Sequence, residues 1–195
     1  NYMRKIVLDL ETKNSFQDVG RRDPAALDLS LVGIYESETD SYQSFLEEEL
    51  PRLWPILERA DLLIGFNIIH FDIPILDKYY HGALRSLHML DLLREVEHVL
   101  GRRIGLDALA RSTLGTSKSA GGMDAIRWWR AGEIEKIRRY CLDDVRITKE
   151  LYEHALAHGT LSYEDRDSKR PIPLDTSLWE MLAAAAAPMT MTMPW

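Results

Sequence analysis

"KIVLDLET", residues 5–12, is the stretch that decides the fold. Its apolar and β-branched residues predict a buried strand. Side chains alternate between the two faces of a strand, so Asp9 and Glu11 point to the same side, together with Val7. Two buried carboxylates repel each other unless an arginine, a lysine or a metal ion compensates their charge. The alternative is that the strand frays here and that water solvates both groups.

The bulk composition is that of one ordinary globular domain. The chain has 195 residues, of which 46% are hydrophobic and 28% charged, and this length allows a real core. Its one cysteine, Cys141, excludes an intrachain disulfide and suits a reducing compartment. We find neither a signal peptide nor an apolar run of membrane-spanning length. These features predict a cytoplasmic protein with no membrane partner.

Charge is distributed unevenly along the chain. The formal net charge is −7, which argues against a general binder of polyanions. Between Gly101 and Tyr140, however, nine basic residues stand against four acidic ones. The nine, called the basic sector below, are Arg102, Arg103, Arg111, Lys118, Arg127, Arg130, Lys136, Arg138 and Arg139. A basic sector in an acidic protein fits an enzyme with local nucleic-acid contacts, whereas solvated helix faces explain any single member equally well.

The order of predicted elements is strands first and then mostly helices. Further strands are expected over residues 29–35, 40–46 and 61–67, the last being apolar on both faces and therefore central. Helices are expected over 47–60, from 71, over 87–100, over 106–115 and, longest of all, over 132–156. This order predicts an α/β fold in which helices flank a mixed β-sheet.

The chain divides at Gly159 in this interpretation. Residues 1–159 form the predicted domain, and residues 160–195 form a C-terminal extension of unknown role. Ser177 and Glu180 match a capping box, so a short helix is expected in the extension. The extension could pack on the domain, bind a partner protein or mediate formation of a homo-oligomer.

"GFNIIHFD", residues 65–72, is a second cluster of polar residues. Asp72 comes just after the central strand, where a helix begins, and the carboxyl ends of central strands face active sites in open α/β sheets. The alternative is that Asp72 only caps the helix. Asn67 either holds the turn or faces the substrate, and His70 is expected to be a packing or turn residue.

"YCLDDV", residues 140–145, is the third cluster. Tyr140 and Asp144 are four residues apart on a predicted helix, so they lie on one face of it. Asp143 is expected to point elsewhere, to solvent. A buried tyrosine bonded to a neighbouring carboxylate is the alternative explanation of this pair.

Four carboxylates taken together explain the anions of the first strand. They are Asp9, Glu11, Asp72 and Asp144. All-oxygen ligand sets suit hard cations such as Mg²⁺ or Mn²⁺. Two such ions about 4 Å apart can cleave a phosphodiester bond, one by activating water and the other by stabilising the leaving oxygen.

In order and spacing, the three clusters resemble the three motifs of the DEDD 3′–5′ exonucleases, a family of the ribonuclease H-like superfamily. Asp9 and Glu11 match the first motif, Asp-x-Glu. Residues 67–72 match the second motif in the form found in B-family polymerase proofreading domains, Asn-x-x-x-Phe-Asp, which includes Phe71. Tyr140 and Asp144 match the Tyr-x-x-x-Asp motif of the tyrosine branch, DEDDy. The resemblance covers about residues 4–158.

This resemblance implies a ribonuclease H-like fold and two divalent metal ions held by the four carboxylates. It also implies removal of nucleotides from the 3′ end of single-stranded nucleic acid, with Tyr140 orienting the attacking water. Asn67 and Phe71 are expected to contact the substrate. DNA is the expected substrate; an exoribonuclease and a nuclease-like module that binds nucleic acid or a partner without cleaving are the alternatives. Because we find no polymerase or helicase region, a stand-alone nuclease or a fragment of a larger protein is expected.

Four further residues have weaker assignments. Lys118, in a loop of small residues, could reach a phosphate or could simply be solvated. Phe16, after the first motif, could stack on the terminal base or pack in the core. Asp91 and Asp107 lie near predicted helix starts and are expected to be helix caps.

Overall fold

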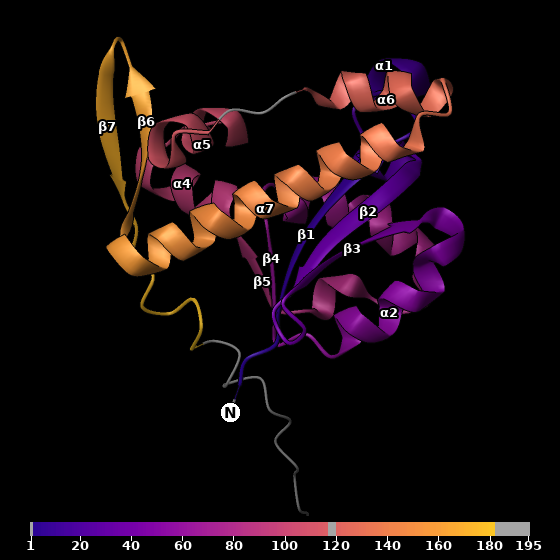
Figure 1. The fold of residues 1–195 in the computed structure, drawn as a ribbon, viewed down its shortest axis with the longest axis horizontal. Helices are drawn as coiled ribbons and strands as arrows, with labels where there is room; N and C mark the ends of the chain where they lie inside the picture. The colour runs from indigo at the N-terminus through magenta and orange to yellow at the C-terminus, as the bar shows by residue number, and fades with distance from the viewer. Residues whose placement is uncertain (1, 117–119, 182–195) are drawn as a thin grey trace, which may run out of the picture.

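A five-stranded sheet with the strand order β3-β2-β1-β4-β5 forms the centre of the computed structural model, which describes residues 2–116 and 120–181 (Figure 1). The strands are β1 (Lys5–Thr12), β2 (Leu29–Glu36), β3 (Ser41–Leu46), β4 (Leu62–Gly65) and β5 (Met89–Asp91). β1 is antiparallel to β2 but parallel to β4, and β2 is antiparallel to β3 while β4 is parallel to β5. The predicted mixed sheet of an α/β protein is therefore confirmed.

Helices cover both faces of this sheet (Figure 1). They are α1 (Phe16–Val19), α2 (Leu50–Glu58), α3 (Ile73–Leu76), α4 (Leu92–Leu100), α5 (Leu106–Leu114), α6 (Gly122–Arg130) and α7 (Ile134–His158). Alternate residues of β1 face different cores. Leu8 packs with residues of α2 and α3, whereas Val7 packs with residues of α4, α5 and α7. In the described part of the chain, no helix combines the length and the apolar character that crossing a membrane requires.

The long helix α7 approaches the sheet closely at Gly33 of β2. A Cβ atom at Gly33 would lie only 3.0 Å from the sulfur of Cys141, so only glycine leaves room for the helix at this distance. Gly33 is paired with Asp9 across the β1–β2 ladder. This close approach therefore brings the middle of α7 over the part of β1 that carries the first motif.

Several elements differ from the predictions. The helix α6 and the short helix α1 lie where no helix was expected. Residues 87–100 were expected to be helical throughout, but they begin with β5, and α4 starts only at Leu92. In addition, β6 (Thr160–Asp165) and β7 (Ser168–Pro173) form an unpredicted hairpin after α7. This hairpin packs on α5, where the side chain of Ser112 donates a hydrogen bond to that of Ser162.

Residues 174–181 run back along the domain rather than away from it. Leu174 and Trp179 are buried in the core beneath α7. The predicted capping box is not formed, because the Ser177 hydroxyl donates to Asp175 and the Glu180 carboxylate accepts from other elements. Residues 177–181 are turns, and the rest of the expected helix lies outside the described residues. The division of the chain at residue 159 stays a prediction.

Candidate active site

The carboxyl-terminal half of β1 brings Asp9 and Glu11 to the face covered by α7. Glu11 is buried and Asp9 is half-buried. A shift in register between Glu11 and Thr12 ends the regular pairing of β1 with β2. The two carboxylates and the sulfur of Cys141 each offer one atom within 4.8 Å of the others, so the first motif and the third are in direct proximity.

A sharp turn after β4 positions the second motif. A Cβ atom at Gly65 would lie 2.0 Å from the Ile68 side chain, so glycine is needed where the chain leaves the strand. Asn67 adopts the left-handed conformation, with φ of 62°, which asparagine tolerates better than most residues. A π-helical turn, η3 (Ile68–Asp72), follows and places Asp72 at its last position. π-helical turns of this kind are frequent at functional sites.

Asp72 is buried beside the first motif. Its carboxylate accepts a hydrogen bond of 3.1 Å from the backbone N–H of Leu10. Burial raises the pKa of Asp72 well above its ordinary value, and the nearby charge of Asp9 raises this pKa further. The alternative that Asp72 only caps a helix is not supported, because its side chain makes no capping bond to α3.

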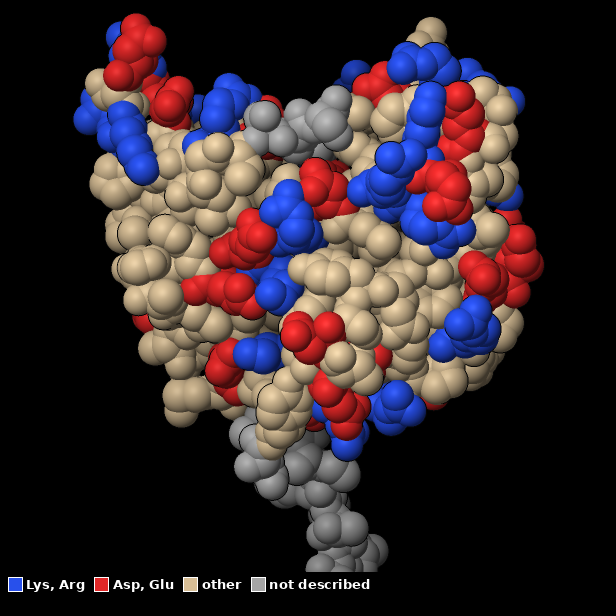
Figure 2. Space-filling model, viewed as in Figure 1, with Lys and Arg blue, Asp and Glu red and all other residues tan. Residues whose placement is uncertain are grey.

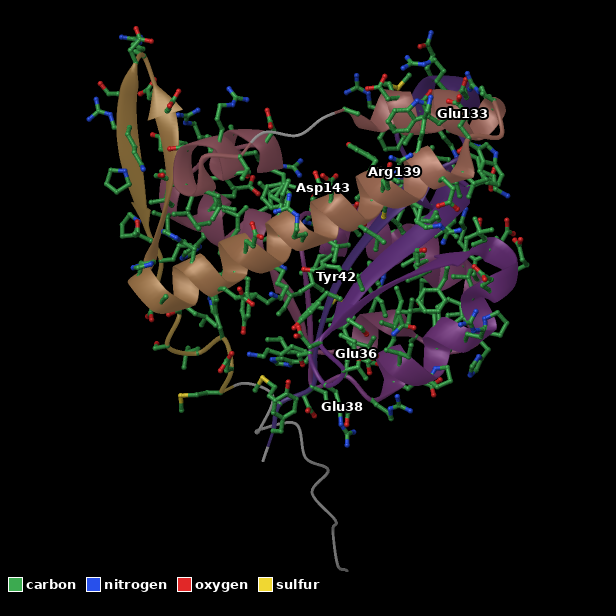
Figure 3. All side chains as sticks on the ribbon, in the orientation of Figure 1. Glu36, Glu38, Tyr42, Glu133, Arg139 and Asp143 are labelled. Carbon is green, nitrogen blue, oxygen red and sulfur yellow. The ribbon has the colours of Figure 1, made fainter. Side chains whose placement is uncertain are left out.

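Helix α7 contributes Tyr140 and Asp144, which are both buried on the side of the helix that faces the sheet. The ring of Tyr140 packs edge-on against that of Trp128, at a centroid distance of 6.0 Å. Asp143, by contrast, lies on the outer side of α7 (Figure 3) and pairs with Arg146 at 2.6 Å. The prediction that Asp143 points away from the site is confirmed.

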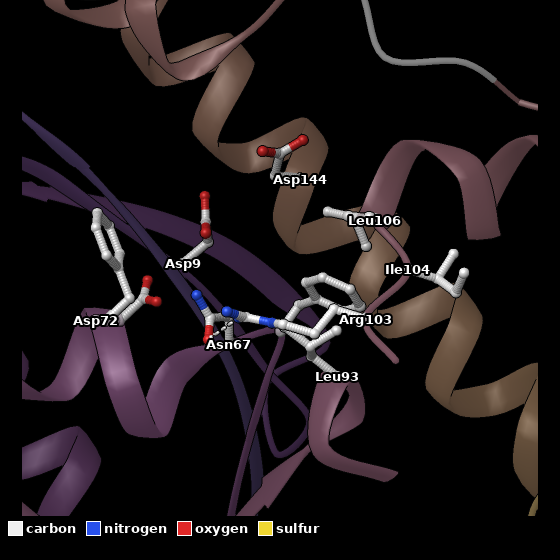
Figure 4. Close-up of a pocket in the computed structure, with 11 residues that line it drawn as sticks. Asp9, Asn67, Asp72, Leu93, Arg103, Ile104, Leu106 and Asp144 are labelled. Atoms are coloured by element: carbon white, nitrogen blue, oxygen red, sulfur yellow. Dashed lines mark hydrogen bonds between the residues drawn. The ribbon is translucent and has the colours of Figure 1, made fainter. Parts of the chain in front are cut away.

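Three of the four predicted carboxylates meet in one pocket of about 360 Å³ (Figure 4). They are Asp9 from β1, Asp72 from η3 and Asp144 from α7. The opposite wall is mostly apolar and consists of Phe66, Leu93, Ile104 and Leu106. The rest of the lining is formed by Asn67, Phe71, Arg103 and Gly105. The pocket thus has a carboxylate wall and an apolar wall, with polar groups between them.

Two of the remaining predicted site residues, Glu11 and Phe16, lie near residues that line this pocket. Glu11 is close to Asp9 but does not line the pocket. Phe16 is half-buried and packs edge-on against Phe71, with ring centroids 6.2 Å apart. Lys118 lies outside the described residues, so its expected phosphate contact stays a prediction. The roles assigned to all these residues stay predictions too.

Cys141 lies behind Asp9 and differs from the carboxylates in its chemistry. Burial, and then the charges of Asp9 and the other site carboxylates, raise the pKa of the Cys141 thiol well above its ordinary value. The protonated thiol donates weak hydrogen bonds to the backbone oxygen and the carboxylate of Asp9, at 3.5 and 3.6 Å. Thiolate sulfur is a soft donor, whereas hard cations such as Mg²⁺ prefer oxygen ligands, so we assign Cys141 to support Asp9 rather than to the ligand set.

The donor set fits divalent metal ions. Its members are carboxylates, which suit hard cations such as Mg²⁺ and Mn²⁺. The raised pKa of Asp72 shows that burial and the charge of Asp9 disfavour an anion here, and a bound cation would remove that penalty. Asp9, Glu11, Asp72 and Asp144 are therefore the residues that could hold such ions.

Much of the basic sector is already neutralised by neighbouring carboxylates. Ion pairs join Arg111 to Asp107, Arg127 to Asp124, Arg130 to Asp18, Lys136 to Glu133 and Arg138 to Glu135. Figure 2 accordingly shows blue and red side chains interleaved on the face that carries α7. For these five residues, the alternative of solvated helix faces describes the structure better than a continuous basic track.

Asp91 positions the second motif, a role that the sequence did not suggest. The prediction that Asp91 caps a helix is confirmed, because its carboxylate accepts from the backbone N–H of Leu93 in α4. The same carboxylate accepts from the N–H groups of Asn67 at 2.8 Å and Ile69 at 3.1 Å. Asp107 is not a cap, since Gly105 occupies that position of α5.

Two further features of the site were not predicted from the sequence. Arg103 was named only as a member of the basic sector, and the apolar wall of the pocket was not identified. The guanidinium of Arg103 donates a 2.8 Å hydrogen bond to the side-chain oxygen of Asn67 (Figure 4). These two residues are 36 positions apart, so no local pattern could have joined them. Two adjacent arginines in a short loop were the only signal.

Comparison with known proteins supports the fold. A sequence model of the RNase_H superfamily matches residues 9–156, and curated proteins give no match. The fold is similar to that of the family B DNA polymerase from the hyperthermophilic archaeon Pyrobaculum calidifontis, with a TM-score of 0.62 and 18% sequence identity. The similarity covers 80% of this chain and 25% of the polymerase chain, so the chain spans about a quarter of the polymerase's length.

Proposed function

This chain belongs to the RNase_H superfamily, and we propose that it is a metal-dependent 3′–5′ exonuclease acting on single-stranded nucleic acid, DNA in preference to RNA. Superfamily membership supports a nuclease. One observation carries the finer proposal: carboxylates from β1, η3 and α7 converge on one pocket whose other wall is apolar. The motif resemblance to the tyrosine branch of the DEDD exonucleases supports the 3′–5′ direction.

The pocket suits the terminal unit of a strand. Its volume of about 360 Å³ is near the lower limit of about 300 Å³ for ligand pockets, which leaves room for one nucleotide. The apolar wall would receive the base and sugar, and the carboxylate wall would face the phosphodiester bond that joins this nucleotide to the next. Release of one nucleotide at a time follows from that arrangement.

Two divalent ions at these carboxylates would supply an activated water and would stabilise the leaving oxygen. Within the chain, Asp9, Glu11, Asp72 and Asp144 would hold the ions. Tyr140, one helical turn before Asp144, would orient the attacking water through its hydroxyl. The Cys141 thiol would hold Asp9 in place, and the Leu10 N–H would hold Asp72, through the bonds described above.

A cytoplasmic location stays a prediction.

One cleavage assay tests this proposal. Single-stranded DNA and RNA, each labelled at either the 3′ or the 5′ end, are incubated with the protein in Mg²⁺, Mn²⁺ or EDTA. We expect a 3′ label to appear at once as a mononucleotide, a 5′ label to give a ladder that shortens with time, and EDTA to stop both reactions. Cleavage that starts at the 5′ end, or persists in EDTA, would contradict the proposal.

A further inference from the structure

Two adjacent arginines point in different directions from the short loop between α4 and α5. Gly101, in the left-handed conformation, ends α4, and Gly105 precedes α5. The guanidinium of Arg102 lies over the Tyr163 ring of β6, 5.0 Å from its centroid. Arg103 lines the pocket instead. Ile104, which follows it, is buried in the core, so both ends of this loop are fixed.

Asn67 offers Arg103 a rigid acceptor. Its side-chain oxygen accepts the 2.8 Å bond from the Arg103 Nη2 (Figure 4). Its backbone N–H is held at 2.8 Å by the buried carboxylate of Asp91, which also holds Ile69 and Leu93. The direction of the guanidinium is therefore set by a turn that is itself anchored at several points.

The partner of Arg103 is a neutral amide and not a carboxylate. Within residues 2–116 and 120–181, no carboxylate lies within 4.0 Å of its guanidinium nitrogens, whereas Arg111, Arg127 and Arg130 each have such a partner. A hydrogen bond to an amide leaves the positive charge uncompensated. Most of the five guanidinium N–H donors also remain for another group.

The ligand that fits such a group is an anion with several acceptor oxygens. A guanidinium forms paired, charge-assisted hydrogen bonds with phosphate oxygens. The carboxylates on the other wall would repel a phosphodiester, so a positive group in the same pocket helps to admit one. The proposed substrate carries a phosphate next to its terminal nucleotide, within reach of this position.

We propose that Arg103 binds a phosphate group of the substrate strand and that Asn67 is a positioning residue that directs its guanidinium. This inference rests on the proposed function and assigns one substrate contact within it. It also separates Arg103 from the paired members of the basic sector, whose charges are already compensated. Arg102, in the same loop, packs on the Tyr163 ring of the hairpin β6–β7 instead.

The test is a binding measurement that does not depend on cleavage. Fluorescence anisotropy of a labelled single-stranded oligodeoxynucleotide with a free 3′-hydroxyl is measured in EDTA over a series of salt concentrations. Arg103→Ala is expected to weaken binding about tenfold, the scale of a lost charge-assisted bond. It should also reduce the slope of log affinity against log salt by about 0.7, the value for one phosphate on a single strand. Arg103→Lys should restore most of the slope.

Arg102→Ala is the matched control, because it removes the same charge from the same loop and should leave the slope unchanged. An Arg103→Ala variant that binds like the wild type, with the same slope, would overturn the inference. An Arg103→Ala variant with a lower melting temperature in EDTA but an unchanged salt slope would also overturn it, because Arg103 would then only offset the repulsion among the pocket carboxylates. If the wild type binds but cleaves neither DNA nor RNA, the proposed function fails, while a reduced slope for Arg103→Ala still supports the phosphate contact.

Discussion

The two ends of strand β1 both carry charged groups, but they arrange them in opposite ways. At the amino end, Lys5 donates to Glu180 at 2.7 Å, and the Tyr152 hydroxyl donates to the same carboxylate at 2.6 Å. At the carboxyl end, carboxylates of like charge gather, and the charge of Asp9 raises the pKa of buried Asp72. The charges at the amino end of β1 thus stabilise the fold, whereas those at the carboxyl end destabilise it.

This difference within a single strand indicates where the chemistry lies. Opposite charges at the amino end hold residues 174–181 against the domain, and they compensate each other without a bound ion. A bound cation would stabilise the like charges at the carboxyl end, as the proposed function requires, and groups with perturbed pKa values cluster at functional sites. Changes at the carboxyl end should therefore affect cleavage strongly, whereas changes at the amino end should affect only stability.

The largest effect is expected from Asp144→Asn. This change removes from the pocket a carboxylate that we propose as a metal ligand, and lost metal stabilisation of several kcal/mol corresponds to a fall of about 10³-fold or more in cleavage rate. The measurement is single-turnover cleavage of labelled single-stranded DNA. Asp143→Asn is the matched control, because it makes the same change one residue away on the outer side of α7. Equal activity of the two variants would remove Asp144 from the site.

Tyr140→Phe should have the next largest effect. It keeps the ring and its packing against Trp128 but removes the hydroxyl that we expect to orient the water. Groups that position or exchange a proton contribute about 10²–10⁴-fold to rate, so we expect a fall of about 10²-fold. Mn²⁺ titrations should give nearly the same half-saturating concentration as for the wild type. A normal rate would make Tyr140 a core residue.

Asp72→Asn should raise the stability of the metal-free protein while abolishing cleavage. An asparagine oxygen can still accept from the Leu10 N–H, but the buried negative charge is gone. Removal of an unfavourable functional group commonly stabilises a protein by about 1 kcal/mol. Thermal unfolding in EDTA measures this gain.

The pH dependence of this gain follows from the raised pKa of Asp72. The wild type loses stability as the pH rises from the ordinary carboxyl range through the raised pKa, because the folded state must give up a proton that it holds more tightly than the unfolded state. The advantage of Asp72→Asn should therefore grow as the pH rises above the ordinary carboxyl range and through the raised pKa. A variant less stable than the wild type at every pH would contradict the account of this end of β1.

Glu180→Gln, at the other end of β1, should have the smallest effect. The Lys5–Glu180 pair is partly exposed, so its loss should cost less than about 1 kcal/mol and leave cleavage unchanged. Hydrogen bonds from Lys5 and then Tyr152 lower the pKa of Glu180. Its stabilisation is therefore present above the ordinary glutamate pKa and lost as the pH falls through the lowered value. Melting temperatures of the two proteins should differ at pH 7 and converge as the pH falls below the lowered pKa.

Local sequence pattern was sufficient for most of the sheet and for α7. Alternation and apolar runs identify β1 to β4, and helical spacing identifies the buried stripe of α7 that includes Ile137 and Val145. β5 was missed because it has three residues and leads directly into α4. The hairpin β6–β7 was missed because Pro171 and Pro173 argue against a strand, although β7 pairs along one edge only, with β6.

The candidate site was predictable where short motifs fix it and not where distant segments meet. Asp9, Asp72 and Asp144 were identified from their spacing and placement on elements, and the structure brings them into one pocket. The bond between Asn67 and Arg103 depends on how the α4–α5 loop packs against the end of β4. Such packing between segments far apart in the chain leaves no periodic signal in the sequence.

The central claim is that the carboxyl end of β1 holds divalent ions, and counting those ions tests it most directly. Mn²⁺ binding is titrated in the presence of a nucleoside monophosphate, the product of the proposed reaction. We predict two ions per chain for the wild type, two for Glu180→Gln, and fewer than two for Asp9→Asn. No bound Mn²⁺ in the wild type, or an unchanged count in Asp9→Asn, would contradict the account.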